Sequence, residues 1–454
     1  MVFRHSPEPP PGRPDPRRVL YVCQELPYPI RNGHDQDVAR RLRALADAGV
    51  AMFLVGWAGW VESGGRSGGK AVGAGAVAGG HVAPPVHAGP PADAAPPAHA
   101  HSLATLTPDW RALAFSRGLR RRLLQLPGAI GRPAPVLTRT VSGAHYSEIL
   151  AAARRFAPGM VFIDGLFAAD LGRRLARDLH LTYAYRAHRR EHDHHRRRLR
   201  RQAGVIDKLR QLGRLQGLRR YERGVLGGAL CFLDISVDNV ETWRAEGFEH
   251  GEWLPPLQAL PRNDPRVDGR PREPAGARPR AVFDVGVIAG PCVDDSVTGV
   301  RWLLTDVMPR VRLLRPDALC AVAVPHDADA LKAALAGQAG VRILPDADVP
   351  TMYSHCRVLV NASRSPAGAV VQMADALTTD RPIVSTPEGV FGLPEEVRRC
   401  IAVAPDAPQF AAAVLRALDD PAIDLAARAT QRRRFGPQAI HEMMVSLSVR
   451  AALR

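Results

Sequence analysis

Short apolar runs alternate with amphipathic segments along the first 57 residues. Residues 19–24 (VLYVCQ) are rich in strand-forming side chains, and residues 50–57 (VAMFLVGW) form a second run of this kind. Between them, residues 37–49 carry apolar side chains at helical spacing and end on a glycine, which is typical of a helix C-terminus. Two strands joined by a helix lie parallel in one sheet, so this segment predicts a β-α-β unit.

The same alternation returns in two later parts of the chain. In the first half it predicts helices near residues 110–126 and 147–156, and strands at 160–164 and 230–236. A second series of strands and helices begins near residue 281 and continues through the second half. Two such series predict an α/β protein with two doubly wound, Rossmann-like domains that face each other across a cleft, where ligands bind at the carboxyl ends of the strands.

Three segments lack this periodicity. Residues 1–17 are rich in Pro and Arg and predict a disordered leader. Gly, Pro and Ala supply 26 of the 39 residues from 63 to 101, which predicts a flexible low-complexity insertion. Residues 256–280 are dense in Pro and Arg and predict a linker. The expected ordered parts are a first domain at 18–255, a second domain at 281–435 and a C-terminal helix at 436–454 that packs back on the first domain.

Composition narrows the class of protein. The 454 residues are 46% apolar and 23% charged, which excludes a wholly disordered or fibrous chain. Six cysteines lie far apart without a C-x-x-C pair, so we expect neither a disulfide framework nor a zinc site, and a reducing, cytoplasmic compartment. No window of about 18 residues is apolar enough to cross a bilayer.

Positive charge is the second compositional signal. Lys and Arg number 61 against 45 Asp and Glu, a formal net charge of +16. Residues 186–223 alone hold 14 Lys or Arg and 4 Asp or Glu. Such charge favours anionic partners, which are nucleic acid, acidic lipid headgroups or phosphorylated substrates, and charge alone does not choose among them.

The first candidate for chemistry is the turn at residues 27–34 (PYPIRNGH), which places Gly33 directly before a helix. Free N–H groups and the positive end of the helix dipole at that point favour a phosphate or a developing anion. A turn glycine that needs a positive φ is the alternative interpretation.

The second candidate is His188, which follows the strand-like run LTYAY in the segment YRAHRREH. A histidine beside an arginine at the carboxyl end of a strand can accept or donate a proton while the arginine holds an anion. His192, His194 and His195 follow closely and raise the question of a metal. Because no second group with ligand spacing accompanies them, a solvated basic helix is favoured and no metal site is expected.

The third candidate is the segment 363–375 (SRSPAGAVVQMAD), which reads as a strand end, a turn and a helix. Gly368 lets a ligand approach the backbone, and the N–H groups that follow can hold a diphosphate. Asp375, one to two turns into the helix, could accept hydrogen bonds from ribose hydroxyls. A plain α/β connection with an acidic residue on the helix face is the alternative interpretation.

Taken in order, these motifs resemble bacterial GT-B glycosyltransferases of the family 4 type (group 1), and most closely the subgroup found in exopolysaccharide and cell-envelope glycan clusters. The resemblance runs from about Arg18 to the end of the chain, apart from the insertion at 63–101. The motifs that carry it are QELPYPIRNGHDQ at 24–36, YRAHRREHD at 185–193, RRYERG at 219–224, DVGVIAG at 284–290 and GAVVQMADALTTDRPIVSTPEGVFGL at 368–393.

The resemblance implies transfer of a sugar from a nucleotide diphosphate donor to a lipid-linked or polysaccharide acceptor, with no bound metal or cofactor and with retention of anomeric configuration. The first domain would lie on the acceptor side and the second would bind the nucleotide sugar. His188 and Glu191 match the segment near the transfer centre and are the expected catalytic residues. The expected donor-binding residues are Gly33, Arg364, Gly368, Gln372 and Asp375.

The sequence departs from the family at four of the matched positions. Gln372 stands where the family has a basic residue, Asp375 replaces a Glu, and Arg189 and Ser296 each replace an Asn. Loss of a lysine opposite a diphosphate removes a charge-assisted bond worth roughly 1.5–3 kcal/mol, which Arg364 or another nearby arginine could offset.

Two other functions stay open at this point. Gln372 and Ala367 favour a GT-B-shaped protein without catalysis that binds partners in a glycan assembly complex. Nucleic-acid binding rests on the basic charge alone, since no aromatic-interleaved or zinc motif supports it. For the enzyme, we expect a cytoplasmic protein that binds peripherally to an anionic membrane surface, at the inner face of the plasma membrane.

Overall fold

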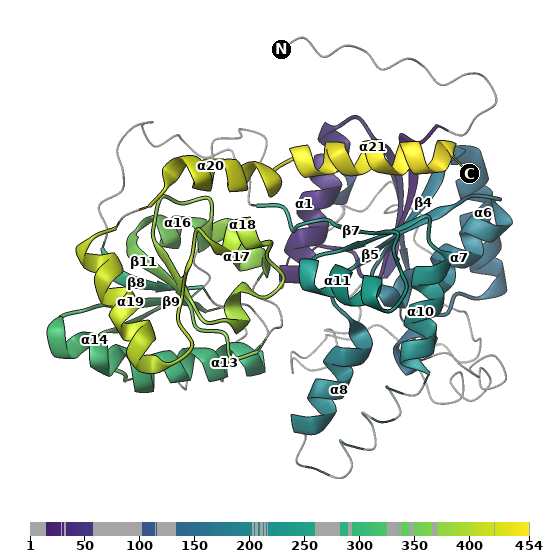
Figure 1. Ribbon diagram of the computed structural model, residues 1–454. Coiled ribbons are helices and arrows are strands. Elements are labelled where there is room, and N and C mark those ends of the chain that lie inside the picture. The colour runs from purple at the N-terminus through teal and green to yellow at the C-terminus, as the bar shows by residue number, and fades with distance from the viewer. Residues whose placement is uncertain are drawn as a thin grey trace, which may run out of the picture.

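In the computed structural model, two sheets form the centres of two domains that lie side by side (Figure 1). The residues described are 15–28, 30, 33–57, 102–113, 115, 133–201, 204, 208, 212, 215, 217–258, 282–288, 293–324, 335, 337–345, 349–365, 370–421 and 423–453. The predicted insertion, nearly all of the predicted leader and most of the predicted linker lie outside them.

The first domain is built on a sheet that has seven strands within the described residues, in the order β3-β2-β1-β4-β5-β6-β7, with every neighbouring pair parallel. Its strands are β1 (Arg18–Cys23), β2 (Ala51–Trp57), β3 (Asp109–Leu113), β4 (Met160–Asp164), β5 (Tyr183–Ala187), β6 (Cys231–Asp234) and β7 (Gly251–Trp253). The helices are α1 (Gly33–Asp47), α5 (Ala134–Leu137), α6 (Gly143–Phe156), α7 (Ala169–Asp178), α8 (Glu191–Arg201), α10 (Leu218–Gly228) and α11 (Val237–Ala245), with a 3-10 turn, η3, at Leu166–Ala168.

The second domain repeats the design with six strands among the described residues, in the parallel order β10-β9-β8-β11-β12-β13. Its strands are β8 (Phe283–Val287), β9 (Cys320–Val324), β10 (Val341–Pro345), β11 (Cys356–Asn361), β12 (Ile383–Ser385) and β13 (Ala402–Val403). The helices are α13 (Val293–Trp302), α14 (Met308–Leu314), α16 (Val349–Ser354), α17 (Val370–Ala376), α18 (Glu395–Arg398), α19 (Ala407–Asp419) and α20 (Leu425–Arg434). A π-helical turn, η4 (Leu303–Val307), joins α13 to α14, and a 3-10 turn, η5, spans Glu388–Val390.

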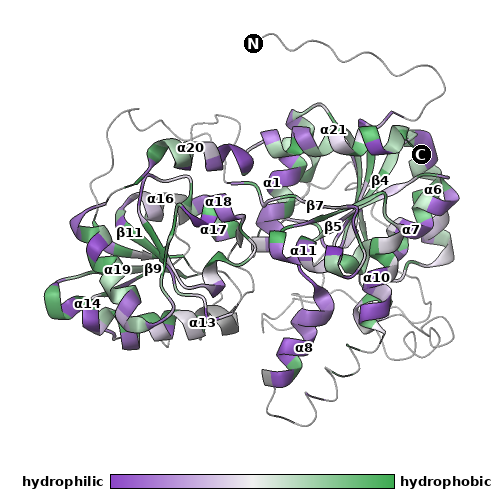
Figure 2. Cartoon of the chain, viewed as in Figure 1, coloured by the Kyte–Doolittle hydropathy of each residue, from purple (hydrophilic) through white to green (hydrophobic). Residues whose placement is uncertain are grey.

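The strands read as nearly continuous apolar runs because helices cover both faces of each sheet. In β1, Val19 and Tyr21 face one buried cluster, while Leu20 and Val22 face another on the opposite side. Figure 2 shows the same pattern, with hydrophobic strands inside and hydrophilic residues on the outer helix surfaces. The predicted α/β architecture of two doubly wound domains is therefore confirmed.

The predicted helix at residues 110–126 is wrong in its first part. Asp109–Leu113 form strand β3, which pairs in parallel with Phe53–Trp57 of β2. Burial of Trp110 and Leu113 beside the apolar neighbours of β2 outweighs the helical spacing that the sequence suggests. Residues 116–126 lie outside the described part of the chain.

The C-terminal helix α21 (Gln438–Ala452) crosses from the second domain and lies along the first (Figure 1). Ile440, Met443 and Leu447 belong to the same buried cluster as Leu42 and Leu45 of α1. The chain therefore connects the two domains twice, through the segment after β7 and through α21. Among the described residues, no helix is long and apolar enough to span a membrane.

Candidate functional site

Charged side chains gather inside the first domain, where β4, β5 and β6 end. Parallel strands present their carboxyl ends at one sheet edge, and α1 runs beside that edge. We name these residues the carboxylate–histidine cluster: Asp37 and Arg41 of α1, Asp164 of β4, Arg186 of β5, His188 directly after β5, and Asp234 of β6. All are buried except His188, whose side chain is 12% exposed.

His188 lies between two carboxylates of this cluster. Its Nε2 is hydrogen-bonded to Oδ1 of Asp164, and its Nδ1 lies 3.5 Å from Oδ2 of Asp37. The edge of its ring contacts the ring of His34, with the centroids 4.3 Å apart. Because each ring nitrogen faces a carboxylate, the arrangement fixes the orientation of the ring at the end of β5.

Asp164 is the centre of the cluster. Besides His188, it accepts a hydrogen bond from the Tyr21 hydroxyl and lies 3.7 Å from Nη2 of Arg41. Burial raises the pKa of Asp164, but the charges of Arg41 and His188 outweigh burial and hold that pKa well below its usual range. The pKa of Asp37 is also lowered. Burial raises this pKa, but the charges of Arg41 and Arg186 lower it by more than burial raises it. Both groups are therefore carboxylates at neutral pH.

His34 sits at the N-terminus of α1, directly after Gly33. Burial, reinforced by the nearby His188, lowers the pKa of His34 to about 3, so this ring is neutral at physiological pH. Sequence reasoning missed His34, Asp37 and Asp164. The signals that could have found them are the polar residues at the start of an otherwise amphipathic helix and the single carboxylate that ends the apolar strand MVFID.

Glu191 is buried at the start of α8, but its carboxylate does not contact His188. It pairs with Nε of Arg189 at 3.1 Å and lies 3.9 Å from Nε2 of His195. Burial raises the pKa of Glu191, but Arg189, His194 and His195 together outweigh burial, so that the net shift is downward. The structure thus brings His188 and Glu191 to the same strand end without joining their side chains.

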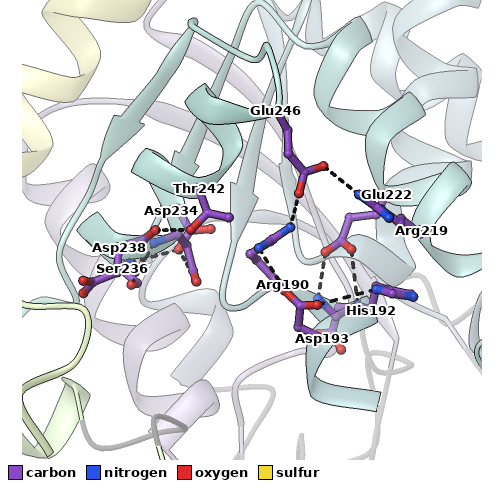
Figure 3. A network of polar contacts seen from close by, with 12 residues as sticks. Arg190, His192, Asp193, Arg219, Glu222, Asp234, Ser236, Asp238, Thr242 and Glu246 are labelled. Carbon is purple, nitrogen blue, oxygen red and sulfur yellow. Dashed lines mark hydrogen bonds and ion pairs between the residues drawn. The ribbon is translucent and has the colours of Figure 1, made fainter. Parts of the chain in front are cut away.

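Glu222 of the RRYERG motif caps α8 from α10. Its two carboxyl oxygens accept the backbone N–H groups of Glu191 at 2.7 Å and His192 at 3.2 Å (Figure 3). Burial raises the pKa of Glu222 to about 8, although both N–H bonds act in the opposite direction. The motif therefore anchors the segment that carries His188 and Glu191.

The expected donor residues lie across the domain boundary from this cluster. Gln372 and Asp375, three residues apart on α17, are both buried. A Cβ atom added to Gly33 would lie 3.1 Å from Nε2 of Gln372, so the absence of a side chain at Gly33 permits the close approach of α1 to α17. The structure thus brings Gly33, Gln372 and Asp375 together.

The other two expected donor residues are placed differently. Nη1 of Arg364 donates to the carbonyl of Pro405 at 3.3 Å, and its guanidinium lies over the ring of Trp302 at 4.9 Å. Both of these contacts lie within the second domain and involve neither Gln372 nor Asp375. Gly368 lies outside the described residues.

Polar contacts between the two domains include the following among the described residues. Arg40 of α1 forms two hydrogen bonds with the carboxylate of Asp375, at 2.9 and 3.0 Å. Asp238 of α11 accepts the N–H of Gly392 and a bond from Nη2 of Arg398, both at 2.6 Å. Figure 3 shows Asp238 at the end of α11 nearest the second domain.

His192, His194 and His195 raise the question of a metal site in the part of the chain that the structure describes. No cluster of three or more His, Cys, Asp or Glu side chains there could hold a metal ion. His195 contacts the ring of His194, with centroids 5.5 Å apart, and lies near Glu191.

The chain is similar to known glycosyltransferases in part of its sequence and in its fold. Residues 285–420 match the family model described as glycosyl transferases group 1. No curated protein sequence matches the chain. Sucrose-phosphate synthase from Thermosynechococcus elongatus is similar in structure, with a TM-score of 0.57 at 15% identity over 96% of this chain and 99% of that one.

Two further solved structures have the same arrangement. Anabaena Alr3699/HepE, in complex with UDP and glucose, has a TM-score of 0.56 at 12% identity and covers 95% of this chain and 99% of its own. A glycosyltransferase from Rickettsia africae has a TM-score of 0.54 at 10% identity, over 94% of this chain and 98% of that one. The chain therefore has the GT-B fold of two Rossmann-like domains, and its residues 285–420 match the model of the glycosyl transferases group 1 family.

Proposed function

We propose that this protein transfers a sugar from a nucleotide diphosphate donor to a lipid-linked or polysaccharide acceptor, without a metal and with retention of anomeric configuration. One observation carries the proposal: the group 1 domain lies against the helix of the first domain that contributes to the carboxylate–histidine cluster. Helix α17 of that domain faces α1, whose first residues are Gly33 and His34. Donor and acceptor groups would react between these two elements.

The donor would bind on the second domain. Backbone N–H groups at the start of α17 would hold the diphosphate, and Asp375 would accept hydrogen bonds from the ribose. N–H groups and arginines are the donors that would neutralise the departing diphosphate without a metal. Anabaena HepE is known in complexes with UDP and UDP-glucose, so a uridine nucleotide sugar is the first donor to test.

A second candidate function is a GT-B-fold binding protein that has lost catalysis and serves in a glycan assembly complex. The uncharged Gln372 at the family's basic position favours it, as does its burial against Gly33. Sugar transfer separates the two candidates, because a binding protein would hold a nucleotide sugar without consuming it.

Gly368→Val is expected to abolish binding of the nucleotide sugar while the protein stays folded, because the added side chain would occupy the space of the diphosphate. A panel of nucleotide diphosphates and nucleotide sugars, read by thermal shift and then by calorimetry, identifies the ligand. Gly143→Val is the matched control, since a Cβ at Gly143 meets no atom within 4 Å. Unchanged nucleotide affinity in folded Gly368→Val would show that the diphosphate does not bind at this turn.

We also propose that the basic surface of the first domain binds anionic membranes from the cytoplasmic side. Among the side chains of α8 and α10 that the structure describes, the exposed arginines are Arg196, Arg198, Arg200, Arg219 and Arg220. Figure 2 shows α8 as hydrophilic along most of its length. These charges lie on the acceptor-side domain, where a lipid-linked acceptor would have to approach.

Replacing Arg196, Arg198 and Arg220 with Glu should reduce co-sedimentation with vesicles that contain acidic lipid. Each well-placed charge contributes about 1 kcal/mol to such binding, and added salt weakens it. Neutral phosphatidylcholine vesicles serve as the control surface. Equal binding of the unmutated protein to neutral and anionic vesicles would contradict the membrane proposal.

A further inference from the structure

The ion pair between Arg40 and Asp375 lies at the domain boundary, and the proposed reaction does not use it. It joins α1 to α17 through two residues that lie 335 positions apart in the sequence. Both Nη atoms of Arg40 bond to the two oxygens of Asp375, and Nη1 also donates to the carbonyl of Leu257 at 3.0 Å. The Arg40 side chain is 18% exposed and that of Asp375 is 3% exposed, so water screens this pair only weakly.

Contacts around the pair cover the same face of α17. Gln372, one turn before Asp375, is buried beneath Gly33 of α1. Its Oε1 is buried and has no hydrogen-bond partner. Leaving such an acceptor without a partner is unfavourable, so this packing costs free energy that the bidentate ion pair has to offset.

We propose that Arg40 is a latch that competes with the nucleotide for Asp375. This inference rests on the proposed function, in which Asp375 accepts hydrogen bonds from the ribose. The guanidinium of Arg40 bonds to both carboxylate oxygens of Asp375, which are the acceptors that the two ribose hydroxyls would need. Nucleotide binding therefore requires Arg40 to leave Asp375, and the contact between α1 and α17 opens when it does.

The latch couples donor binding to the relative position of the domains. A state in which Asp375 is held by Arg40 cannot bind the ribose, so the apparent affinity for the nucleotide is reduced by the fraction of molecules in that state. The contact of Asp238 with Gly392 and Arg398 involves neither helix of the latch. It can persist and hold the domains together at that point while they move apart at the latch.

Arg40→Ala should raise the affinity for UDP by about tenfold, because the state in which Arg40 holds Asp375 loses its ion pair. Calorimetry on the full chain measures this affinity. Arg43→Ala is the matched control on the same helix and should leave the affinity unchanged. Weaker binding of UDP by Arg40→Ala would show that Arg40 is itself a nucleotide ligand and would overturn the latch. Equal binding by Arg40→Ala and the unmutated protein would overturn it as well.

Small-angle X-ray scattering without nucleotide supplies a second measurement. Arg40→Ala and Asp375→Asn should both have a larger radius of gyration than the unmutated protein, whereas Arg43→Ala should match it. Identical radii in all four proteins would overturn the latch even if UDP binds. Absence of UDP binding in every protein would instead overturn the proposed donor site, and an expanded Arg40→Ala would then still support the interdomain ion pair.

Discussion

His188→Ala should lower the rate of sugar transfer by on the order of a hundredfold or more while the protein stays folded. His188 lies at the carboxyl end of β5, and its ring is fixed by Asp164 on one side and Asp37 on the other. Removing the ring leaves these carboxylates without the group that separates them and takes the imidazole away from the proposed transfer site. Donor affinity depends mainly on the second domain and should change little.

The control for this experiment is His192→Ala. His192 lies on α8, is 24% exposed, and its nearest ionic partner is Asp193 at 3.6 Å. We expect this variant to retain the unmutated rate. Turnover of folded His188→Ala at the level of the unmutated protein would remove His188 from the mechanism.

Asp164→Ala should lower the free energy of unfolding by about 3–5 kcal/mol, the range for breaking a buried ion pair by removing one partner. Arg41 would lose one carboxylate neighbour and retain its ion pair with Asp37, and the Tyr21 hydroxyl would lose its acceptor. Urea denaturation followed by circular dichroism measures the change. Asp193→Ala, which breaks the more exposed pair with Arg190 at 2.9 Å, should cost less than about 1 kcal/mol.

The pH dependence of the free energy of unfolding tests the contribution of Asp164 independently. The pKa of Asp164 is lower in the folded chain than in the unfolded one, so its contribution is fully present above the unfolded value of about 3.9 and is lost as the pH falls below it. The difference in stability between the unmutated protein and Asp164→Ala should therefore shrink below about pH 4. A difference that is absent at pH 7, or one that does not change on acidification, would contradict the assigned role of Asp164.

The fold was predictable from the sequence because buried parallel strands leave a clear apolar signal. VLYVCQ and VAMFLVGW correspond to β1 and β2, and MVFID is β4. Strand β3 was not predictable, since its five residues contain Arg111 and run into a segment whose helical spacing suggests a helix at 110–126. Its burial depends on pairing with β2, which local sequence does not encode.

The candidate site was predictable only in part. His188 and Asp375 stand in recognisable motifs, but Asp37 and Arg41 look like solvent-facing residues of a charged helix. They are buried because the sheet places α1 beside the ends of β4 and β5. The pairing of Arg40 with Asp375 depends on how the two domains pack, and no sequence motif reports that packing.

The most direct test of the central claim is a transfer assay with the purified, unmutated protein. Nucleotide sugars labelled in the sugar, with UDP-glucose first, are incubated with a membrane lipid and polysaccharide extract in the presence of EDTA. The account predicts that label from one nucleotide sugar appears in the acceptor fraction and that EDTA leaves the rate unchanged. Folded protein that transfers no label from any nucleotide sugar to any fraction would contradict it.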